Sequence, residues 1–274
     1  MASTTDGVAA RPGARRRGRN VPRRPWRDRA PAFIAGFSAL ALWQAVIMIF
    51  DVPGYIAPTP VEVAQTLVEK ADLFWRNLIP TFLEAIAGFF LGNGIAILLA
   101  VWFVHSRTAE RSLYPIAVFI NTIPILALAP ILVLLFGAGY TPKVIIAALI
   151  CFFPTLVNMV RGLKAVNPAT LDLMRILSAS PMEILWKVRF PSSLPFLFAA
   201  LKIAATTCVI GAVVSEWIGS NEGLGAVLLQ AMYDYRSQTL YATVVLAAGM
   251  AVTFFVFISW LERRVIRWKS NDVH

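Results

Sequence analysis

The residue types that carry out enzymatic chemistry are sparse in this sequence, and their spacing forms no catalytic motif. The two cysteines, Cys151 and Cys208, exclude a disulfide framework, and the two histidines, His105 and His274, leave little for a zinc site. No Gly-Lys pair occurs anywhere in the 274 residues, so the phosphate-binding loop of an ATPase is absent. The metalloprotease and serine-hydrolase motifs are missing too. We therefore expect the chain not to be an enzyme, with no metal site and no cofactor of its own.

A second group of residues points to transport. Polar residues and prolines interrupt otherwise apolar runs; a polar side chain in lipid tends to face protein or water, and a proline bends its helix. Together they predict a polar, hinge-bearing path, while hydrogen bonding between helices is the alternative for each residue by itself. The candidate path residues are Asn121, Thr122, Pro124, Asn158, Thr206, Thr207, Ser215 and Glu216.

The elements that must position these residues are six apolar runs. The chain is 58% hydrophobic and 15% charged, whereas a soluble domain has about 25% charged residues. The runs cover residues 32–50, 85–104, 112–136, 144–160, 196–218 and 240–261, and each approaches the length of a membrane span. They lack the alternation of a β-barrel strand, so we expect an all-α integral membrane protein with six transmembrane helices.

Lysine and arginine are divided unequally between the segments that join these runs. The two tails and the segments after the second and fourth runs hold 20 of them, and the alternate segments hold 4. The positive-inside rule therefore predicts that both termini are cytoplasmic. We expect residues 1–30 to form a disordered, Arg/Pro-rich cytoplasmic tail, residues 31–268 the six-span domain, and residues 269–274 a C-terminal tail. The tail arginines favour a topological role over nucleic-acid binding.

The cytoplasmic segment 161–195 is too polar to span and predicts two short helices with a sharp turn. Asn167 and Pro168 predict the start of the first helix, and Ser180, Pro181 and Glu183 predict the start of the second with a capping box. Pro191 and Pro195 are expected to end the second helix before the fifth run. Apolar residues on both helices predict a projecting knob that needs a partner surface, with an internally packed loop as the alternative.

This segment resembles the signature loop of permease subunits of bacterial ABC importers, which reads Glu-Ala-Ala, three residues, Gly, nine residues, Ile, any residue, Leu-Pro. The residues that take these places, or flank the turn, are the expected ATPase-coupling residues: Asp172, Leu173, Met174, Ser178, Ala179, Ser180, Pro181, Glu183, Val188 and Pro191. Ser178 departs from the pattern by replacing its glycine. We expect a right-handed turn there, because Ser180 already begins the next helix and a left-handed serine costs on the order of 1 kcal/mol.

Residues 55–268 as a whole are similar to permeases of the nitrate/sulfonate/taurine type, including Glu216-Trp-Ile-Gly-Ser220 and Gly223-Leu-Gly225. The resemblance implies a type I ABC importer permease in the bacterial inner membrane, with a second permease protomer (a homodimer favoured over a heterodimer). It also implies a cytoplasmic ATPase dimer that holds ATP and magnesium, an extracytoplasmic substrate-binding protein and surrounding lipid. The stretch 121–130 looks more like permeases for thiamin-pyrimidine precursors or riboflavin than for nitrate or sulfonate.

An ion-gradient-driven secondary transporter is the alternative. Such proteins usually need carboxylates inside the membrane or broken helices that form ion sites. Glu84 and Glu216 are expected near the outer ends of their spans, and no inverted repeat is evident, so the sequence favours the ABC permease.

Overall fold

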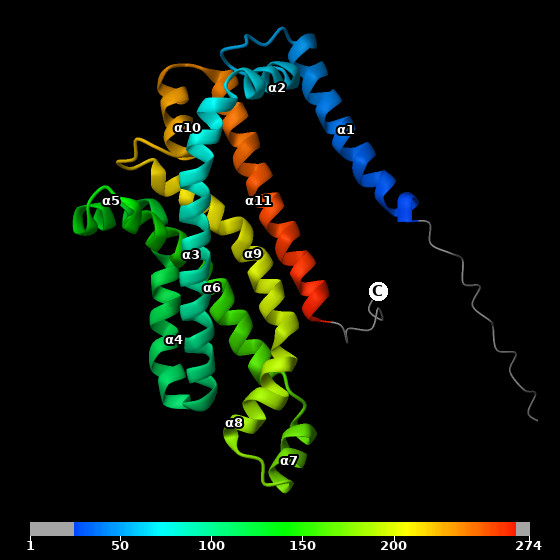
Figure 1. Ribbon diagram of the computed structural model, residues 1–274, viewed down its shortest axis with the longest axis vertical. Helices are drawn as coiled ribbons and strands as arrows, with labels where there is room; N and C mark the ends of the chain where they lie inside the picture. Colours follow the sequence, from blue (N-terminus) through cyan, green and yellow to red (C-terminus); the bar gives the residue numbers. More distant parts are fainter. Residues whose placement is uncertain (1–24, 267–274) are drawn as a thin grey trace, which may run out of the picture. The chain divides into compact units, whose positions relative to one another are not determined.

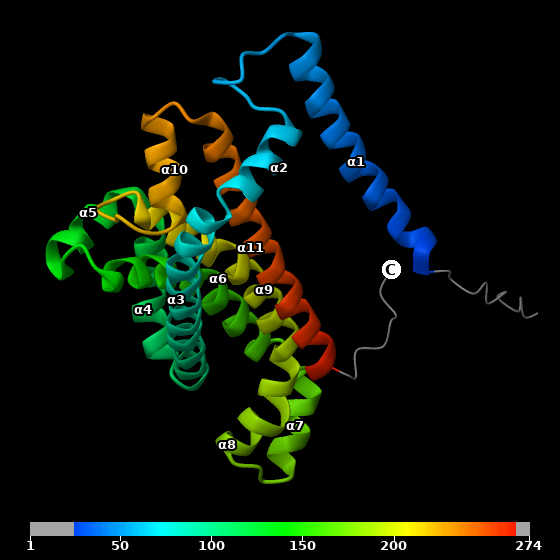
Figure 2. The same cartoon turned by 45° about the horizontal axis from the view of Figure 1, so that its top comes forward.

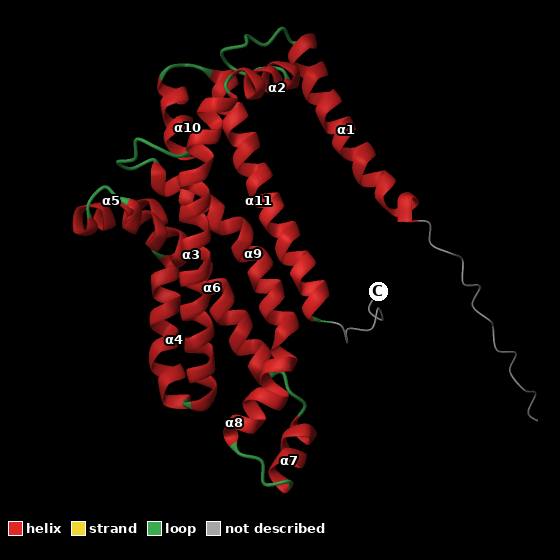
Figure 3. Cartoon of the chain, in the orientation of Figure 1, coloured by secondary structure: helices red, strands yellow, loops and turns green. Residues whose placement is uncertain are grey.

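The computed structural model describes residues 25–266, and these residues form helices and connecting loops without any strand (Figure 1, Figure 3). The all-α prediction is confirmed for this range, while most of the predicted tail 1–30 and the whole of the tail 269–274 lie outside it. The elements are α1 (Pro25–Ile49), α2 (Pro60–Glu69), α3 (Ala71–His105), α4 (Arg107–Thr122), α5 (Ile125–Phe136), α6 (Tyr140–Lys164), α7 (Pro168–Ile176), α8 (Pro181–Ile184), the π-helix η1 (Leu185–Arg189), α9 (Phe190–Glu216), α10 (Leu224–Tyr233) and α11 (Ser237–Val265).

The chain divides after Val46 into two units, and α1 lies almost wholly in the first. This helix begins at Pro25, inside the segment predicted as a tail. Its apolar part is Phe33–Ile49, which is shorter than the helices in the second unit that can cross a membrane. The length of α1 by itself therefore does not establish the first predicted span.

Four helices of the second unit are long and apolar enough to cross a membrane. They are α3, α6, α11 and the continuous helix Pro181–Glu216, which comprises α8, η1 and α9. The pair α4 and α5 adds a fifth span if the two helices are counted together, although they are bent by 98°. The structure therefore provides four or five candidate spans among the described residues, against the six predicted.

The bend between α4 and α5 breaks the run predicted as the third span. Ile123 has φ −70° and ψ 125°, an extended conformation, and Pro124 follows it. A proline disfavours the helical conformation of the preceding residue, because its ring clashes with that residue's backbone. Pro130, which lies inside α5, does not interrupt that helix.

The core of the second unit is the packing of α6 against α3 and α9, which lie side by side in both views (Figure 1, Figure 2). Small residues allow this approach: a Cβ atom on Gly88 would lie 2.4 Å from the Cβ of Ala147, and one on Gly92 would lie 2.2 Å from the carbonyl oxygen of Ala148. Such contacts are typical of helices that associate within lipid, where packing rather than the hydrophobic effect drives association. The three helices form the frame that holds the functional sites at its two ends.

Candidate functional site

The turn between α7 and α8 is built from local capping interactions. The side chain of Asn167 accepts a hydrogen bond of 2.9 Å from the backbone N–H of Ala169, and Pro168 opens α7, as predicted. At the second start, the Ser180 hydroxyl accepts from the N–H of Glu183 at 3.3 Å, and the Glu183 carboxylate accepts from the N–H of Ser180 at 3.0 Å. This reciprocal pair is the capping box that the sequence predicted.

Ser178 adopts the left-handed conformation, with φ +56°, so the prediction of a right-handed turn was wrong. The physical reason lies in the end of α7: the N–H of Ala179 donates to the carbonyl of Met174 at 3.0 Å, and the N–H of Ser178 donates to the carbonyl of Arg175 at 2.9 Å. This hydrogen-bond pair is a Schellman motif, which requires a left-handed residue after the helix and usually places glycine there. The carbonyl partners gained at the helix end offset the cost of a left-handed serine.

The second loop helix does not end at Pro191 or Pro195, contrary to the prediction. The π-helix η1 joins α8 to α9 without a break, and the backbone N–H of Phe190 donates to the carbonyl of Leu185 five residues earlier. Proline normally breaks a helix because it lacks an N–H and its ring clashes with the carbonyl four residues back. The wider π turn directly before Pro191 gives that ring room, so one rigid helix leads from the loop into the membrane core.

The loop helices project beyond the end of the bundle (Figure 1, Figure 2). Their apolar side chains are largely exposed. No residue of α7 is buried, and Ile176 is 79% exposed. The further exposed apolar side chains on this surface are Leu173, Leu177, Met182 and Trp186. We call this loop surface, from Asp172 to Pro191, the knob. All ten predicted coupling residues lie on it, and its exposed apolar face argues against an internally packed loop.

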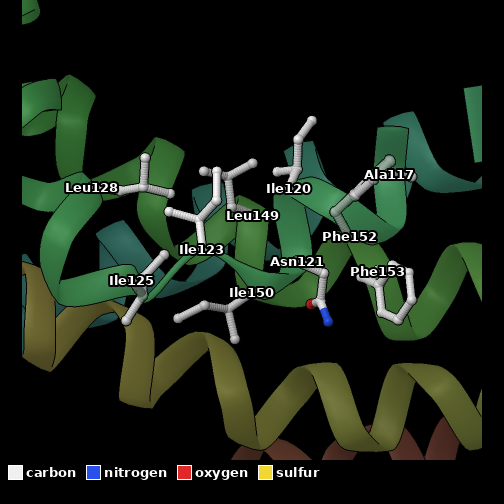
Figure 4. Close-up of a pocket in the computed structure, with 10 residues that line it drawn as sticks. All are labelled: Ala117, Ile120, Asn121, Ile123, Ile125, Leu128, Leu149, Ile150, Phe152 and Phe153. Atoms are coloured by element: carbon white, nitrogen blue, oxygen red, sulfur yellow. The ribbon is translucent and has the colours of Figure 1, made fainter. Parts of the chain in front are cut away.

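The predicted path residues fall into two groups. Asn121, Thr122 and Pro124 lie at the bend between α4 and α5, where a small hollow of about 70 Å³ is lined by Asn121 and by Phe152 and Phe153 of α6. Figure 4 shows the Asn121 carboxamide pointing to the same side as the Phe153 ring, toward α9. The hollow therefore has a polar amide from the bend and an aromatic ring from α6 on the same side.

The other predicted path residues make bonds within or between helices of the protomer. The Asn158 side chain donates to the carbonyl of Pro154, and the hydroxyls of Thr206 and Thr207 donate to the carbonyl of Ile203. Ser215 and Glu216 are buried inside the protomer. The structure does not bring them to the hollow at Asn121, and their role in a path stays a prediction.

A cluster that sequence reasoning missed lies at the end of the bundle opposite the knob. Glu84 on α3 is 1% exposed and Glu216 at the end of α9 is 0% exposed, and Lys143 on α6 forms an ion pair of 2.8 Å with Oε1 of Glu84. We call these three residues the carboxyl cluster. Glu84 lies inside α3 rather than at its end, because this helix begins at Ala71. Acids near the ends of two apolar runs were the available signal in the sequence, but only the fold shows that Lys143 is the partner of Glu84.

The carboxyl cluster anchors the loop that follows α9. Oε1 of Glu216 accepts a hydrogen bond of 2.6 Å from the Thr81 hydroxyl, and Oε2 accepts one of 2.5 Å from the backbone N–H of Gly225. Gly223 has φ +107°, and a Cβ atom there would lie 2.0 Å from the Glu216 carboxylate. The Gly223-Leu-Gly225 sequence is therefore required by the close approach of backbone to carboxylate.

Comparisons with known proteins extend these observations. Residues 92–269 match the family described as "Binding-protein-dependent transport system inner membrane component". A probable ABC transporter permease protein of Haemophilus influenzae is 36% identical over 86% of this chain and 96% of its own length. The formylaminopyrimidine transport permease protein ThiX of Halalkalibacterium halodurans is 31% identical over 85% of this chain and 93% of its own length. The riboflavin transport system permease protein RibX of Chloroflexus aurantiacus is 32% identical over 85% of this chain and 87% of its own length.

The fold is also similar to a solved structure. An inward-facing conformation of the MetNI methionine ABC transporter contains a chain that matches with a TM-score of 0.60 at 21% identity, covering 74% of this chain and 99% of that one. At this identity the likeness supports the arrangement of the helices alone.

Proposed function

Since the chain belongs to the family of binding-protein-dependent transport system inner membrane components, we propose that it forms half of the membrane pathway of an ATP-driven solute importer. As a member of this family it is a multi-pass inner-membrane permease of an ABC importer and not itself an enzyme. The proposal concerns its topology, its contact with an ATPase, its path and its solute.

In the proposed topology six spans cross the membrane and both termini are cytoplasmic. The helix α1 is the first span, and the bent pair of α4 and α5 together forms the third. The distribution of lysine and arginine supports this orientation. The two tails and the segment that forms the knob are among the segments rich in these residues, which the positive-inside rule places in the cytoplasm. The knob then faces the cytoplasm, where ATP is available.

The knob is the proposed contact for a cytoplasmic ATPase dimer, which holds ATP and magnesium. The observation that carries this proposal is the exposed apolar surface of the knob on a turn fixed by two capping motifs. A rigid, uncovered apolar surface is suited to a groove on another protein. The continuous helix Pro181–Glu216 leads from the knob to the carboxyl cluster, so a push on the knob would be carried through the bundle.

The proposed path lies between two copies of the chain, with a homodimer favoured over a heterodimer. The bend between α4 and α5 supports it, because it carries Asn121, Thr122 and Pro124 on an exposed surface beside a hollow. We include Asn158, Thr206, Thr207, Ser215 and Glu216 as second-rank candidates on the grounds of their polarity inside spans. An extracytoplasmic binding protein would deliver the solute to this path.

The proposed solute is a thiamin-pyrimidine precursor or a riboflavin-like compound, with nitrate, sulfonate or taurine as the alternative. The names of two relatives at more than 30% identity, ThiX and RibX, support the first choice. The aliphatic sulfonate permease SsuC of Bacillus subtilis is 27% identical and supports the second.

The test of the coupling proposal is a charge placed at the turn. Ala179→Glu introduces a carboxylate into the apolar contact, so ATP-dependent uptake of radiolabelled solute into vesicles should fall by at least about tenfold while the permease stays inserted. Ala169→Glu is the matched control, because the same charge at the first turn of α7 is stabilised by the helix dipole. Unchanged uptake by Ala179→Glu, or uptake that follows an ion gradient without ATP, would contradict the proposal and favour a secondary transporter.

A further inference from the structure

The carboxyl cluster holds two buried acids and one base. Oε1 of Glu84 pairs with Lys143 at 2.8 Å, and both oxygens of Glu216 accept hydrogen bonds from Thr81 and Gly225. The remaining oxygen, Oε2 of Glu84, is buried without a hydrogen-bond partner. A buried polar atom without a partner is costly, so its presence indicates that something binds there.

Two ionised carboxylates are not a stable arrangement at this place. Thr81, which donates to Glu216, lies three residues before Glu84 on the same face of α3, so the two carboxyl groups are close together, and Lys143 supplies one positive charge against two negative ones. Like charges this close, out of water, repel strongly, and two carboxyl groups that share a site normally hold one proton between them. A single proton removes the excess negative charge and gives Oε2 of Glu84 a partner.

The surroundings of Glu216 indicate which of the two carboxyl groups carries the proton. Glu216 accepts the backbone N–H of Gly225 at the start of α10, where the partial positive charge of a helix N-terminus favours an anion. Glu84 has no such donor on its free oxygen. We propose that the carboxyl cluster is a binding site for a single proton, held between Oε2 of Glu84 and the carboxylate of Glu216.

The bound proton would fasten the loop between α9 and α10 to the rest of the bundle. Lys143 also donates to the Ser220 hydroxyl at 2.8 Å, and the Asn77 side chain accepts from the N–H of Gly223 at 2.8 Å. These bonds tie the loop to α6 and α3. Loss of the proton adds a second buried anion beside the loop, which weakens its attachment. The occupancy of this site by the proton therefore depends on the pH on that side of the membrane.

The charged surroundings of the cluster are few. A hollow of about 340 Å³ opens beside it, lined among others by Glu84, Lys143 and Tyr140, and by Glu222 of the loop. Glu84 of α3 and Glu216 of α9 are the acids of the cluster itself, and the titratable residue of α10, Tyr233, is exposed at the far end of that helix. Glu222 is exposed and is the matched control for a carboxyl group in the same hollow.

The sign of the pH effect follows from linkage. In the unfolded chain both glutamic acids have lost their protons well below neutral pH, whereas the folded cluster keeps one. The folded state therefore binds more protons, and its stability falls as pH rises. One proton changes the folding equilibrium by up to about tenfold for each pH unit over which it is lost.

The experiment uses the full-length permease assembled with its ATPase in detergent, and infrared spectra and thermal unfolding recorded from about pH 6 to about pH 10. We expect the wild type to show a protonated carboxyl band that disappears as pH rises, together with a falling unfolding temperature. Glu84→Gln, whose amide replaces the protonated acid, should lack the band and its alkaline loss of stability, and Glu222→Gln should behave as the wild type.

Several results would overturn this assignment. One is a wild-type spectrum without the band at the acid end of the range, and another is the band persisting unchanged in Glu84→Gln. Stabilisation by sodium against choline at constant pH and ionic strength would show that a metal cation, not a proton, occupies the site. If Glu84→Gln fails to fold, the proposal is tested by the wild-type titration and the Glu222→Gln control alone. Both must then show the protonated carboxyl band and lose it as pH rises. The proposal is independent of transport, because failure of the uptake test leaves the band and its titration unaffected.

Discussion

The knob and the carboxyl cluster occupy opposite ends of one continuous helix, Pro181–Glu216, and they are built in opposite ways. The knob is held by bonds between residues three to five apart, such as Ser180 with Glu183, and its side chains are exposed. In the cluster, the bond from Lys143 to Glu84 and the bond from Thr81 to Glu216 join residues 59 and 135 apart in the chain, and the carboxyl groups are buried. Local bonding suits a surface that must keep its shape before a partner arrives, whereas long-range bonding ties several helices into one unit.

The knob and the carboxyl cluster also differ in how much their ion pairs contribute to stability. Exposed ion pairs on the knob, such as Asp172 with Arg175, contribute about 0–1 kcal/mol because water and salt screen them. Removing one partner of a buried pair costs more, because the other charge is left unpaired in a low-dielectric region. Substitutions in the cluster should therefore affect the stability of the fold, and substitutions in the knob should affect the partner contact.

The largest expected effect comes from removing the base of the cluster. Lys143→Met leaves Glu84 and Glu216 without a positive charge, so we expect a loss of about 3–5 kcal/mol in the free energy of unfolding. Thermal unfolding of the purified permease in detergent measures it. Arg76→Met is the control, since it removes an exposed ion pair with Asp72 on α3 and should change stability by less than about 1 kcal/mol. Equal losses of unfolding free energy in the two variants would contradict the expected difference between buried and exposed ion pairs.

A smaller effect is expected from the glycine that touches the cluster. Gly223→Ala places a Cβ atom against the Glu216 carboxylate and also forces alanine to φ +107°, so we expect a loss of about 2–3 kcal/mol. Gly137→Ala is matched to it, because Gly137 has φ +80° but nothing within 4 Å of the added Cβ atom. This control should lose only the conformational part, about 1 kcal/mol. If both variants lose the same amount, the close contact at Gly223 contributes nothing.

The smallest expected effect is a gain at the knob. Ser178→Gly removes the strain of a left-handed serine, so association with the ATPase should stay the same or tighten, by up to about 1 kcal/mol. Calorimetry of the purified partners measures this association. Ser192→Gly, at an exposed position in the first turn of α9, is the control and should give no tightening. Weaker association of the Ser178→Gly variant alone would indicate that the serine side chain itself contacts the ATPase.

Much of the knob could be predicted from the sequence, because its determinants are close together in the chain. The caps at Asn167 and Ser180 and the proline starts of α7 and α8 depend on three or four neighbouring residues, and they were predicted correctly. The left-handed Ser178 was not, because the two carbonyls that stabilise it depend on where α7 ends. The passage of the helix through Pro191 was missed for a similar reason, since a π turn has no signal in residue type.

The apolar runs, read from the sequence, fixed the class of the protein. Their composition determined an all-α membrane protein, and the loop signature led to the permease family, because burial in lipid and short-range capping leave direct marks on the residues. Tertiary structure decided the rest: the burial of Glu84 inside α3 and its pairing with Lys143 on another helix. These features arise where helices distant in the chain pack together, and the energy that selects them exists only once that packing has formed.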